Sequence, residues 1–457
     1  MSSCVHTIRA RQEDITEYQR SMACLTRLMD QWQSVNQQYG QSEPLKVEQI
    51  LQRYQEMLQY GRNLGRHSAN AFAGLTEQVP GMIDFVRQDI QQMQEAMIEA
   101  HAQARQSQRR QQENAAVLLN VLQQRMPEQQ EVIHQLSELV EKGDTAEATQ
   151  LMHRAMQLIG QQTTTLTEQQ QVLLQKLQQP ESASTPSMWS AESDDNTHSP
   201  DRRLQRIDRH IAELAVLDPQ QDIAAFIQRA AALSLMPQDR QWDTLSDSLI
   251  LDLAQVTRTA KALVEQQQEL SLLIAGLSSF ESSETVELIE QLSQVLASRQ
   301  LPLMSEAIAQ AKAATQQQQQ QMAALARREA VLEGLAKLGY EVHEQMAGSW
   351  LNQGKVVIRK PATPGYGLEL GGASESERFQ IRAVALAEQR DVSRDTDIES
   401  LWCSEHQALQ RILAESGNEL TIDRALPAGA TPLKVVVQAD ESASMQTSVR
   451  HGRERKL

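Results

Sequence analysis

Apolar residues recur every three or four positions through roughly the first three quarters of the chain, and this pattern stops at Gly339 and Tyr340. Two clear rows are Leu25, Leu28, Trp32 and Val35, and then Ile83, Val86, Ile90, Met93 and Met97. Such spacing places a narrow apolar stripe along one side of a helix, as in a coiled coil or slender bundle. The pattern therefore predicts long helices that pair with other helices, either within one chain or between chains.

Glycine and proline mark the expected ends of these helices. The first helix is predicted over about residues 5–38, and Pro44 suits the first turn of the second. Pro80 and the following glycine are expected to interrupt the chain before a long helix over residues 82–125. Because residues 101–114 are almost wholly polar, we expect this part to be exposed or to bind something else.

The composition changes between the first helical region and the second. Residues 180–202 are rich in serine, proline and acids and lack any period, which predicts a disordered linker. Trp189 stands alone within it and is a candidate docking residue. Similar helical rows resume after the linker, and the six glutamines at 316–321 are interpreted as helix surface within this glutamine-rich region.

Beyond Tyr340 the pattern changes to short β-branched runs that are broken by glycine and proline. We predict a strand directly after Gly339, then strands in GKVVIRKP, YGLELGG and RFQIRAVAL, a helix, and strands at 419–422 and 433–437. Trp402 is expected in the core, facing the sheet. Trp350, in the loop-like segment GSWLNQG, is the better candidate for an exposed contact.

The expected fold is therefore mainly α, with long helices in a coiled-coil or helical-bundle arrangement, followed by a small C-terminal α+β domain. The predicted parts are an N-terminal helical region at 1–179, the linker at 180–202, a second helical region at 203–338, the α+β domain at 339–438 and a disordered basic tail at 439–457.

Aromatic residues make up only 4% of the chain and hydrophobic residues 40%. This is little for a large compact core, because aromatic side chains normally supply much of the buried area, and it suits helices that pair along narrow apolar stripes. The formal net charge of −16 disfavours nonspecific nucleic-acid binding. The C-terminus is an exception, since Arg450, Arg453, Arg455 and Lys456 form a small basic tail. This tail is either a solvated end or a contact for nucleic acid or an acidic partner.

The three cysteines, Cys4, Cys24 and Cys403, are too far apart to suggest a disulfide framework or a zinc site. No apolar stretch approaches the roughly 20 residues of a membrane span, and the N-terminus does not resemble a signal peptide. We therefore expect a cytoplasmic protein without a membrane partner.

Candidate catalytic groups are sparse. Cys403 and His406 lie three positions apart on a predicted helix, and we interpret them as a buried cysteine beside a surface histidine. A metal could be bound by side chains of the types found at Glu341, His343 and Glu344. Alternation along the predicted strand, however, would place them on two different faces.

A nuclease is suggested only faintly by Glu369, Gln380 and Arg382, because the position two residues after Glu369 is Gly371 where a lysine would be wanted. An enzyme in this domain would need a polar cleft that gathers several of four side chains: Glu369, Arg382, Lys360 and Asp423. No phosphate-binding loop is present in the sequence. We predict no catalytic activity, no metal and no cofactor.

Two functions fit these observations. The first is a non-enzymatic structural or adaptor subunit of a multiprotein complex, with an elongated body that self-associates through its heptads and a C-terminal docking domain. The alternative is an accessory component of a bacterial defence or DNA-processing system that acts with a separate ATPase or nuclease, its basic tail touching nucleic acid.

Overall fold

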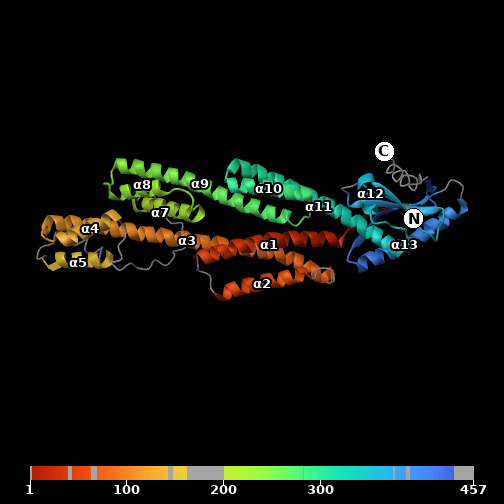
Figure 1. Ribbon diagram of the computed structural model, residues 1–457, viewed down its shortest axis with the longest axis horizontal. Coiled ribbons are helices and arrows are strands. Elements are labelled where there is room, and N and C mark those ends of the chain that lie inside the picture. The colour runs from red at the N-terminus through yellow and green to blue at the C-terminus, as the bar shows by residue number, and fades with distance from the viewer. Residues whose placement is uncertain are drawn as a thin grey trace, which may run out of the picture.

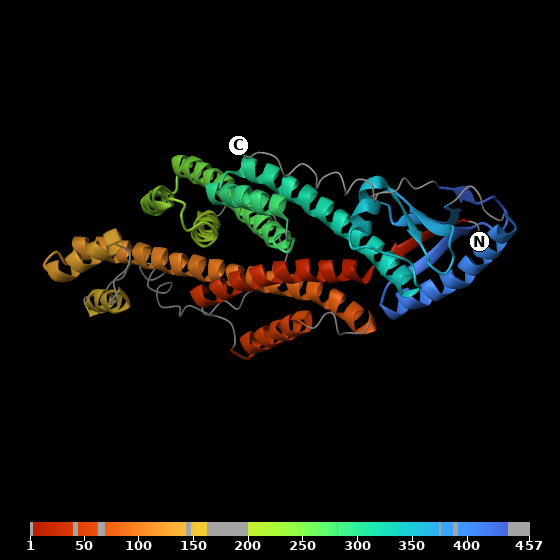
Figure 2. The ribbon, with the colours of Figure 1, turned by 45° about the vertical axis from the view of Figure 1, so that its right-hand side comes forward.

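The computed structural model describes residues 3–39, 44–62, 69–142, 148–161, 200–280, 282–373, 376–386 and 392–436. The molecule is elongated: long helices lie side by side as a rod, and a small sheet covered by helices forms one end (Figures 1 and 2). The predicted class, mainly α with a small C-terminal α+β domain, is confirmed.

The rod is built from two groups of helices. The first group is α1 (Arg11–Tyr39), α2 (Pro44–Arg62), α3 (Ala69–Arg125), α4 (Gln130–Lys142) and α5 (Ala148–Gln161). The second group is α7 (Pro200–Leu217), α8 (Ala224–Leu235), α9 (Arg240–Leu277), α10 (Ser283–Ser298) and α11 (Leu301–Lys337). At 1.5 Å per residue, α3 alone is about 85 Å long.

The heptad rows meet each other within one chain. Leu25 and Trp32 of α1 are buried in the same core as Val86 and Ile90 of α3. Asp89 is buried beside this seam, where it accepts a hydrogen bond of 2.8 Å from the Trp32 indole and an ion pair from Lys46. These two apolar rows are therefore covered by helices of the same chain.

One expectation about α3 is wrong, and for a second the structure selects one of its two alternatives, the docking of another element on the polar middle of the helix. The helix runs without a break through Pro80, whose side chain is exposed while its neighbours Val79 and Met82 are buried against α1. The polar middle of α3 is covered by α7 of the same chain, because Arg105 and Arg109 reach the buried Asp208 at 3.6 and 3.2 Å. Burial there stabilises the rod only because these charges are paired.

The second group of helices follows the sequence closely. The predicted row on α7 is buried, and Pro302 lies in the first turn of α11. Helix α9 begins at an N-cap, Asp239, whose carboxylate accepts hydrogen bonds from the backbone N–H groups of Gln241 and Trp242. Helices α9 and α11 pack together, and α9 also packs on α1, so the two groups form one body.

The sheet contains β1 (Ser3–Arg9), β2 (Lys355–Arg359), β3 (Tyr366–Gly371), β4 (Arg378–Ala385), β5 (Glu419–Ala425) and β6 (Lys434–Val435). The strand order is β2-β3-β4-β1-β5, with antiparallel pairing, and β6 adds a short parallel pairing to β4. The N-terminal residues are thus a central strand of the C-terminal sheet. The prediction of a helix from residue 5 is wrong, because the first helix begins at Arg11.

A second correction concerns the segment after Gly339. Its predicted strand is absent from the described residues, and a short helix, α12 (Met346–Gln353), forms instead and ends at Gly354 in the left-handed conformation. Ala347 and Trp350, three positions apart on α12, are both buried. The predicted helix after β4 is α13 (Asp395–Glu415), which follows a 3₁₀ turn over Val392–Arg394.

One face of the sheet forms the core of this end of the molecule. The inward side chains Ile8, Ile358, Leu368 and Ile381 lie in one apolar cluster with residues of α11, α12 and α13. Trp402 of α13 is part of this cluster, as predicted. The opposite face carries the alternate residues of the same strands, and these are mainly polar.

Candidate functional site

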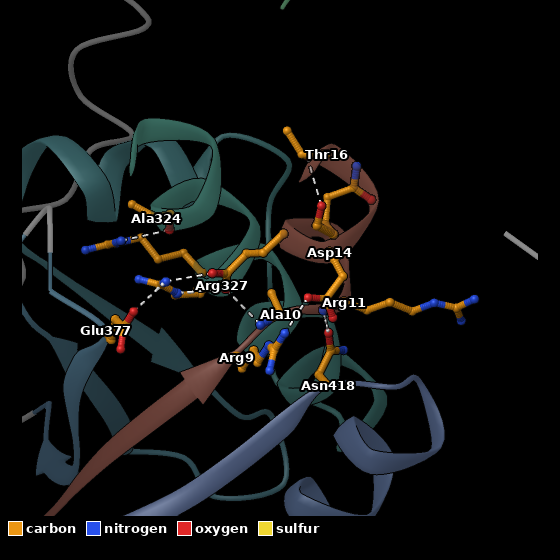
Figure 3. A network of polar contacts seen from close by, with 12 residues as sticks. Arg9, Ala10, Arg11, Asp14, Thr16, Ala324, Arg327, Glu377 and Asn418 are labelled. Carbon is orange, nitrogen blue, oxygen red and sulfur yellow. Dashed lines mark hydrogen bonds and ion pairs between the residues drawn. The ribbon is translucent and has the colours of Figure 1, made fainter. Parts of the chain in front are cut away.

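The junction between the rod and the sheet is tied by charged side chains (Figure 3). Arg327 of α11 donates hydrogen bonds of 2.8 and 2.6 Å to the two carboxylate oxygens of Glu13 on α1, and a third bond of 3.0 Å to Glu377. Glu13 also accepts a bond of 2.9 Å from the backbone N–H of Ala10, the residue that separates β1 from α1. A two-bond arginine–carboxylate pair fixes direction as well as distance.

A second contact holds the start of α1 to the sheet. The backbone N–H of Arg11 donates to the Asn418 side chain at 2.8 Å, and this residue immediately precedes β5 (Figure 3). Arg9 and Asp14 form a more exposed pair at 2.7 Å. The start of α1 is therefore held to α11 and to the edge of the sheet.

Helix α11 also enters the apolar core of the sheet domain, where Val331, Leu332 and Leu335 are buried. Gly334 lies against α13, and a Cβ atom there would lie 2.6 Å from Leu409 Cδ1. A larger residue at position 334 would therefore require the Leu409 side chain to shift. The rod and the sheet domain are therefore connected at two places. Strand β1 leads into α1 through Ala10, and α11 extends from the rod into the core of the sheet domain.

On the polar face of the sheet, Glu369 is the centre of an ion-pair group. Its carboxylate, which is only 8% exposed, accepts hydrogen bonds from Arg382 and, at 2.8 Å, from Lys434. Burial acts to raise the pKa of Glu369, but the hydrogen bonds from Lys434 and Arg382 outweigh it and hold the pKa below its usual value. This carboxylate is therefore a fixed anion between two cations.

Asp423 belongs to a separate group on the same face. It accepts a hydrogen bond of 2.9 Å from the Thr7 hydroxyl and pairs with Arg378 at 3.0 Å. Arg378 and Arg382 are four residues apart on β4, a separation of about 13 Å at the rise of a strand. Glu369 and Asp423 are consequently too far apart to share a metal ion, whose oxygen ligands lie at about 2–2.6 Å.

Lys360 lies in a third group, at the edge of the core. It pairs with Glu405 of α13, and the Tyr340 hydroxyl donates to the same carboxylate at 2.6 Å. The Lys360 ammonium also lies 5.1 Å from the centre of the Tyr340 ring. Burial and the bond to Glu405 raise the pKa of Tyr340. The four side chains on which the enzyme hypothesis depended thus divide among three groups instead of lining one cleft.

A buried histidine pair was missed from the sequence. His6 of β1 and His406 of α13 are both buried, with Nδ1 of His6 lying 3.4 Å from Nε2 of His406 and the rings stacked at 4.8 Å. His406 is therefore not a surface residue, and Cys403 is only partly buried. Burial, together with the second histidine, lowers the pKa of His6 to about 3, and burial also lowers that of His406.

The remaining metal candidates do not come together. Glu341, His343 and Glu344 are exposed in the turn before α12. Among the described residues, no group of three histidine, cysteine or acidic side chains is placed to hold a metal ion.

Trp350 is not the exposed contact that the sequence suggested. Its ring is 1% exposed, packs edge-on against Phe379 and carries the Arg328 guanidinium at 5.3 Å. The glycines at 348 and 354 suggested a loop, whereas the segment forms α12 and packs the Trp350 indole against Phe379 of β4. The other predicted contacts, Trp189 and the basic residues Arg450, Arg453, Arg455 and Lys456, lie outside the described residues.

A groove in the rod, of about 330 Å³, lies where α1 and α3 meet α7 and α9. Leu28 and Ile90 contribute to its lining, together with several glutamines and the pair formed by Glu213 and Lys261 at 3.2 Å. Two further charged residues of the lining, Arg87 and Glu95, pair with Asp84 and Arg209, which are not part of the lining.

Comparison of the chain with protein-family models, with curated proteins and with solved structures gives no match. Across the described part of the chain, none of the helices combines the length and the apolar character that a membrane crossing requires.

Proposed function

We propose that this protein is a structural or adaptor subunit that holds a small docking domain at a fixed distance and orientation from the far end of a helical rod. The observation that supports it best is the direct connection at the junction. A single residue, Ala10, separates β1 from α1, and α11 passes from the rod into the core of the sheet domain.

The ion pairs at this junction add to the support. Arg327 is 11% and Glu13 18% exposed, so their bonds are partly shielded from water and salt. A flexible linker would let the domain sample many orientations, whereas these contacts favour one. Such rigidity is useful in a spacer, because it sets which partners can be engaged together.

The far end of the rod offers a second place for contact. The hairpin of α4 and α5 lies at the end of α3 opposite the sheet (Figure 1) and has its own apolar core, which includes Leu122, Leu136 and Ala155. We therefore place one partner at this hairpin and another at the sheet domain. A cytoplasmic location belongs to the same proposal and is consistent with the free thiols of Cys24 and Cys403.

Site-specific photo-crosslinking in cells tests the proposal. A crosslinking amino acid is introduced at one exposed position of the hairpin, Glu131, and at one of the sheet domain, Gln407 on α13. We expect two different partner proteins, one from each end, and neither from a control position at the exposed Arg258 in the middle of the rod. The same products from all three positions, or nucleotide or nucleic-acid hydrolysis by the purified chain, would contradict the proposal.

Self-association through the heptad rows stays a prediction. Since the rows on α1 and α3 are covered within the chain, a second copy would need another surface. Sedimentation velocity over a range of concentrations measures this directly and is independent of the crosslinking result.

A further inference from the structure

The polar face of the sheet carries an excess of positive charge. In the register of the described strands, the residues that share this face with Glu369 alternate with the buried residues of the core face. The basic residues on it, here called the cationic face, are Arg9, Lys355, Arg359, Arg378, Arg382, Arg424 and Lys434. The acidic residues on it are Glu369, Glu419 and Asp423.

Ion pairing within the face leaves much of this charge accessible. Arg382 and Lys434 share one carboxylate, that of Glu369, and remain 30% and 44% exposed. Arg378 is 72% exposed although it pairs with Asp423. Lys355 and Arg424 are exposed at opposite edges of the sheet. A local cationic surface of this kind is unexpected on a chain whose formal net charge is −16.

A bulge in β5 contributes to this arrangement. Val5 lies opposite Arg424 while His6 lies opposite Ile422, so Asp423 is the extra residue and the pairing shifts there. The Asp423 side chain nevertheless bonds to Thr7 on the polar face. Two consecutive side chains, Asp423 and Arg424, therefore lie on one face, which a regular strand would not allow.

The chemistry of the face favours phosphate over a protein surface. Five of its basic residues are arginines, whose planar guanidinium groups match phosphate oxygens with two parallel hydrogen bonds. Protein interfaces usually depend on a central aromatic or apolar anchor. The aromatic residues of the strands, Tyr366 and Phe379, are buried on the core side, and the polar face of the described strands presents none.

We propose that the cationic face binds the phosphodiester backbone of nucleic acid without reading its sequence. The contacts are ionic, since the face has no aromatic platform on which bases could stack. This inference does not depend on the adaptor function, and it differs from a role of the basic tail because the face is built from folded strands. Counterion release then makes the affinity fall steeply with salt.

The test measures binding of the full-length protein to a fluorescent 30-base-pair duplex and to a single strand of the same length, by anisotropy between 50 and 200 mM salt. The triple variant Lys355→Gln/Arg378→Gln/Arg424→Gln removes three exposed charges from the face. We expect its affinity for the duplex to fall at least 10-fold at the lowest salt. The slope of log K against log salt should become shallower by about 0.9 for each lost phosphate contact.

A matched variant controls for net charge. Arg206→Gln/Arg240→Gln/Arg258→Gln removes the same charge from exposed positions of the rod, and its affinity and salt slope should match those of the unchanged protein. A truncated protein that ends at residue 446 lacks the basic tail. Its affinity for the duplex should still fall when Lys355, Arg378 and Arg424 are replaced by glutamine. Absence of binding at 50 mM salt, equal loss in both triple variants, or a loss caused only by the truncation would overturn the proposal. Displacement of the duplex by equal amounts of polyglutamate would assign the face to an acidic protein and would overturn it as well.

Discussion

Arg327 on α11 and Glu13 on α1 are 314 residues apart in sequence, and their side chains meet through two hydrogen bonds of 2.8 and 2.6 Å. Removing one partner from a shielded pair leaves the other charge poorly solvated, which costs more than losing a surface pair. We therefore expect Arg327→Ala to lower the free energy of unfolding by about 2 kcal/mol, below the range for fully buried pairs because both groups retain some exposure.

Urea unfolding measures this loss, and a second cation on the same helix is the matched control. Lys337 pairs with Glu333 at 3.0 Å, but both side chains are about half exposed or more. Lys337→Ala should cost no more than about 0.5 kcal/mol. Equal losses for the two variants would mean that the Arg327–Glu13 pair does not stabilise the junction.

The position of β1 leads to a prediction about fragments. Because β1 pairs with both β4 and β5, a fragment over residues 322–457 lacks the central strand of its sheet. We expect such a fragment to unfold without cooperativity. Fusing residues 1–10 to it through a short Gly/Ser linker should restore a cooperative transition, measured by circular dichroism during heating.

A fused segment that carries Ile8→Asp is the control for this fragment. Ile8 is 2% exposed in the core, so an aspartate there cannot be buried without a large cost. Cooperative unfolding of residues 322–457 alone would contradict the role given to β1.

The sequence predicted those parts of the fold whose signal is local. The spacing of Leu25, Leu28 and Trp32 is visible within a few residues, and so is the stop signal at Gly339. The polar middle of α3 was ambiguous, because its explanation lies in Asp208 on a helix about 100 residues away. Periodicity alone could not identify that partner.

The sheet shows the limits of local patterns more clearly. In β1, the inward position that precedes Ile8 is a histidine, His6, so the alternation of apolar and polar residues is weak. Its partner strands lie more than 370 residues away. The cationic face was invisible for the same reason, since its charges are brought together only by the register of five strands. The signal at Trp350 was misread because Gly348 and Gly354 suggested a loop.

The buried pair His6 and His406 predicts that stability falls at mildly acidic pH. In the unfolded chain both histidines titrate near pH 6.5, whereas burial holds the pKa of His6 at about 3 and lowers that of His406. The unfolded state therefore binds more protons than the native state below about pH 6.5. The contribution of the two neutral histidines to the free energy of unfolding is complete above that pH. It is lost as the pH falls toward 3, by up to about 1.4 kcal/mol per pH unit for each histidine.

Urea unfolding between pH 7 and pH 5 measures this slope. The double variant His6→Phe/His406→Phe keeps the ring packing against Phe379 and Trp402 but removes both titrating groups, so its slope should be smaller than that of the unchanged protein. His343→Gln replaces an exposed histidine and should leave the slope unchanged. Identical slopes in all three proteins would show that the pair is not linked to folding.

Asp208 should be critical to the contact between α3 and α7. Its side chain is 5% exposed and accepts from Arg109 at 3.2 Å, with Arg105 at 3.6 Å. We expect Asp208→Ala to cost about 3 kcal/mol, because Arg105 and Arg109 then lose the buried anion with which they pair. Hydrogen exchange should accelerate over residues 101–114 of α3. The control Asp201→Ala, at an exposed position of α7, should leave the exchange of these residues unchanged.

The stability of Trp350 variants tests whether this side chain is buried, as in the structure, or exposed, as the sequence suggested. If its ring were a surface contact, Trp350→Ala would leave the free energy of unfolding unchanged within about 0.5 kcal/mol. Because the ring is buried against Phe379 and beneath Arg328, we expect a loss of about 3–5 kcal/mol from the lost packing and the cavity. Trp350→Phe retains an aromatic ring in the same space and should recover most of that loss in urea unfolding. A stable alanine variant would instead place Trp350 at the surface, and the packing of α12 against the sheet described above would be wrong.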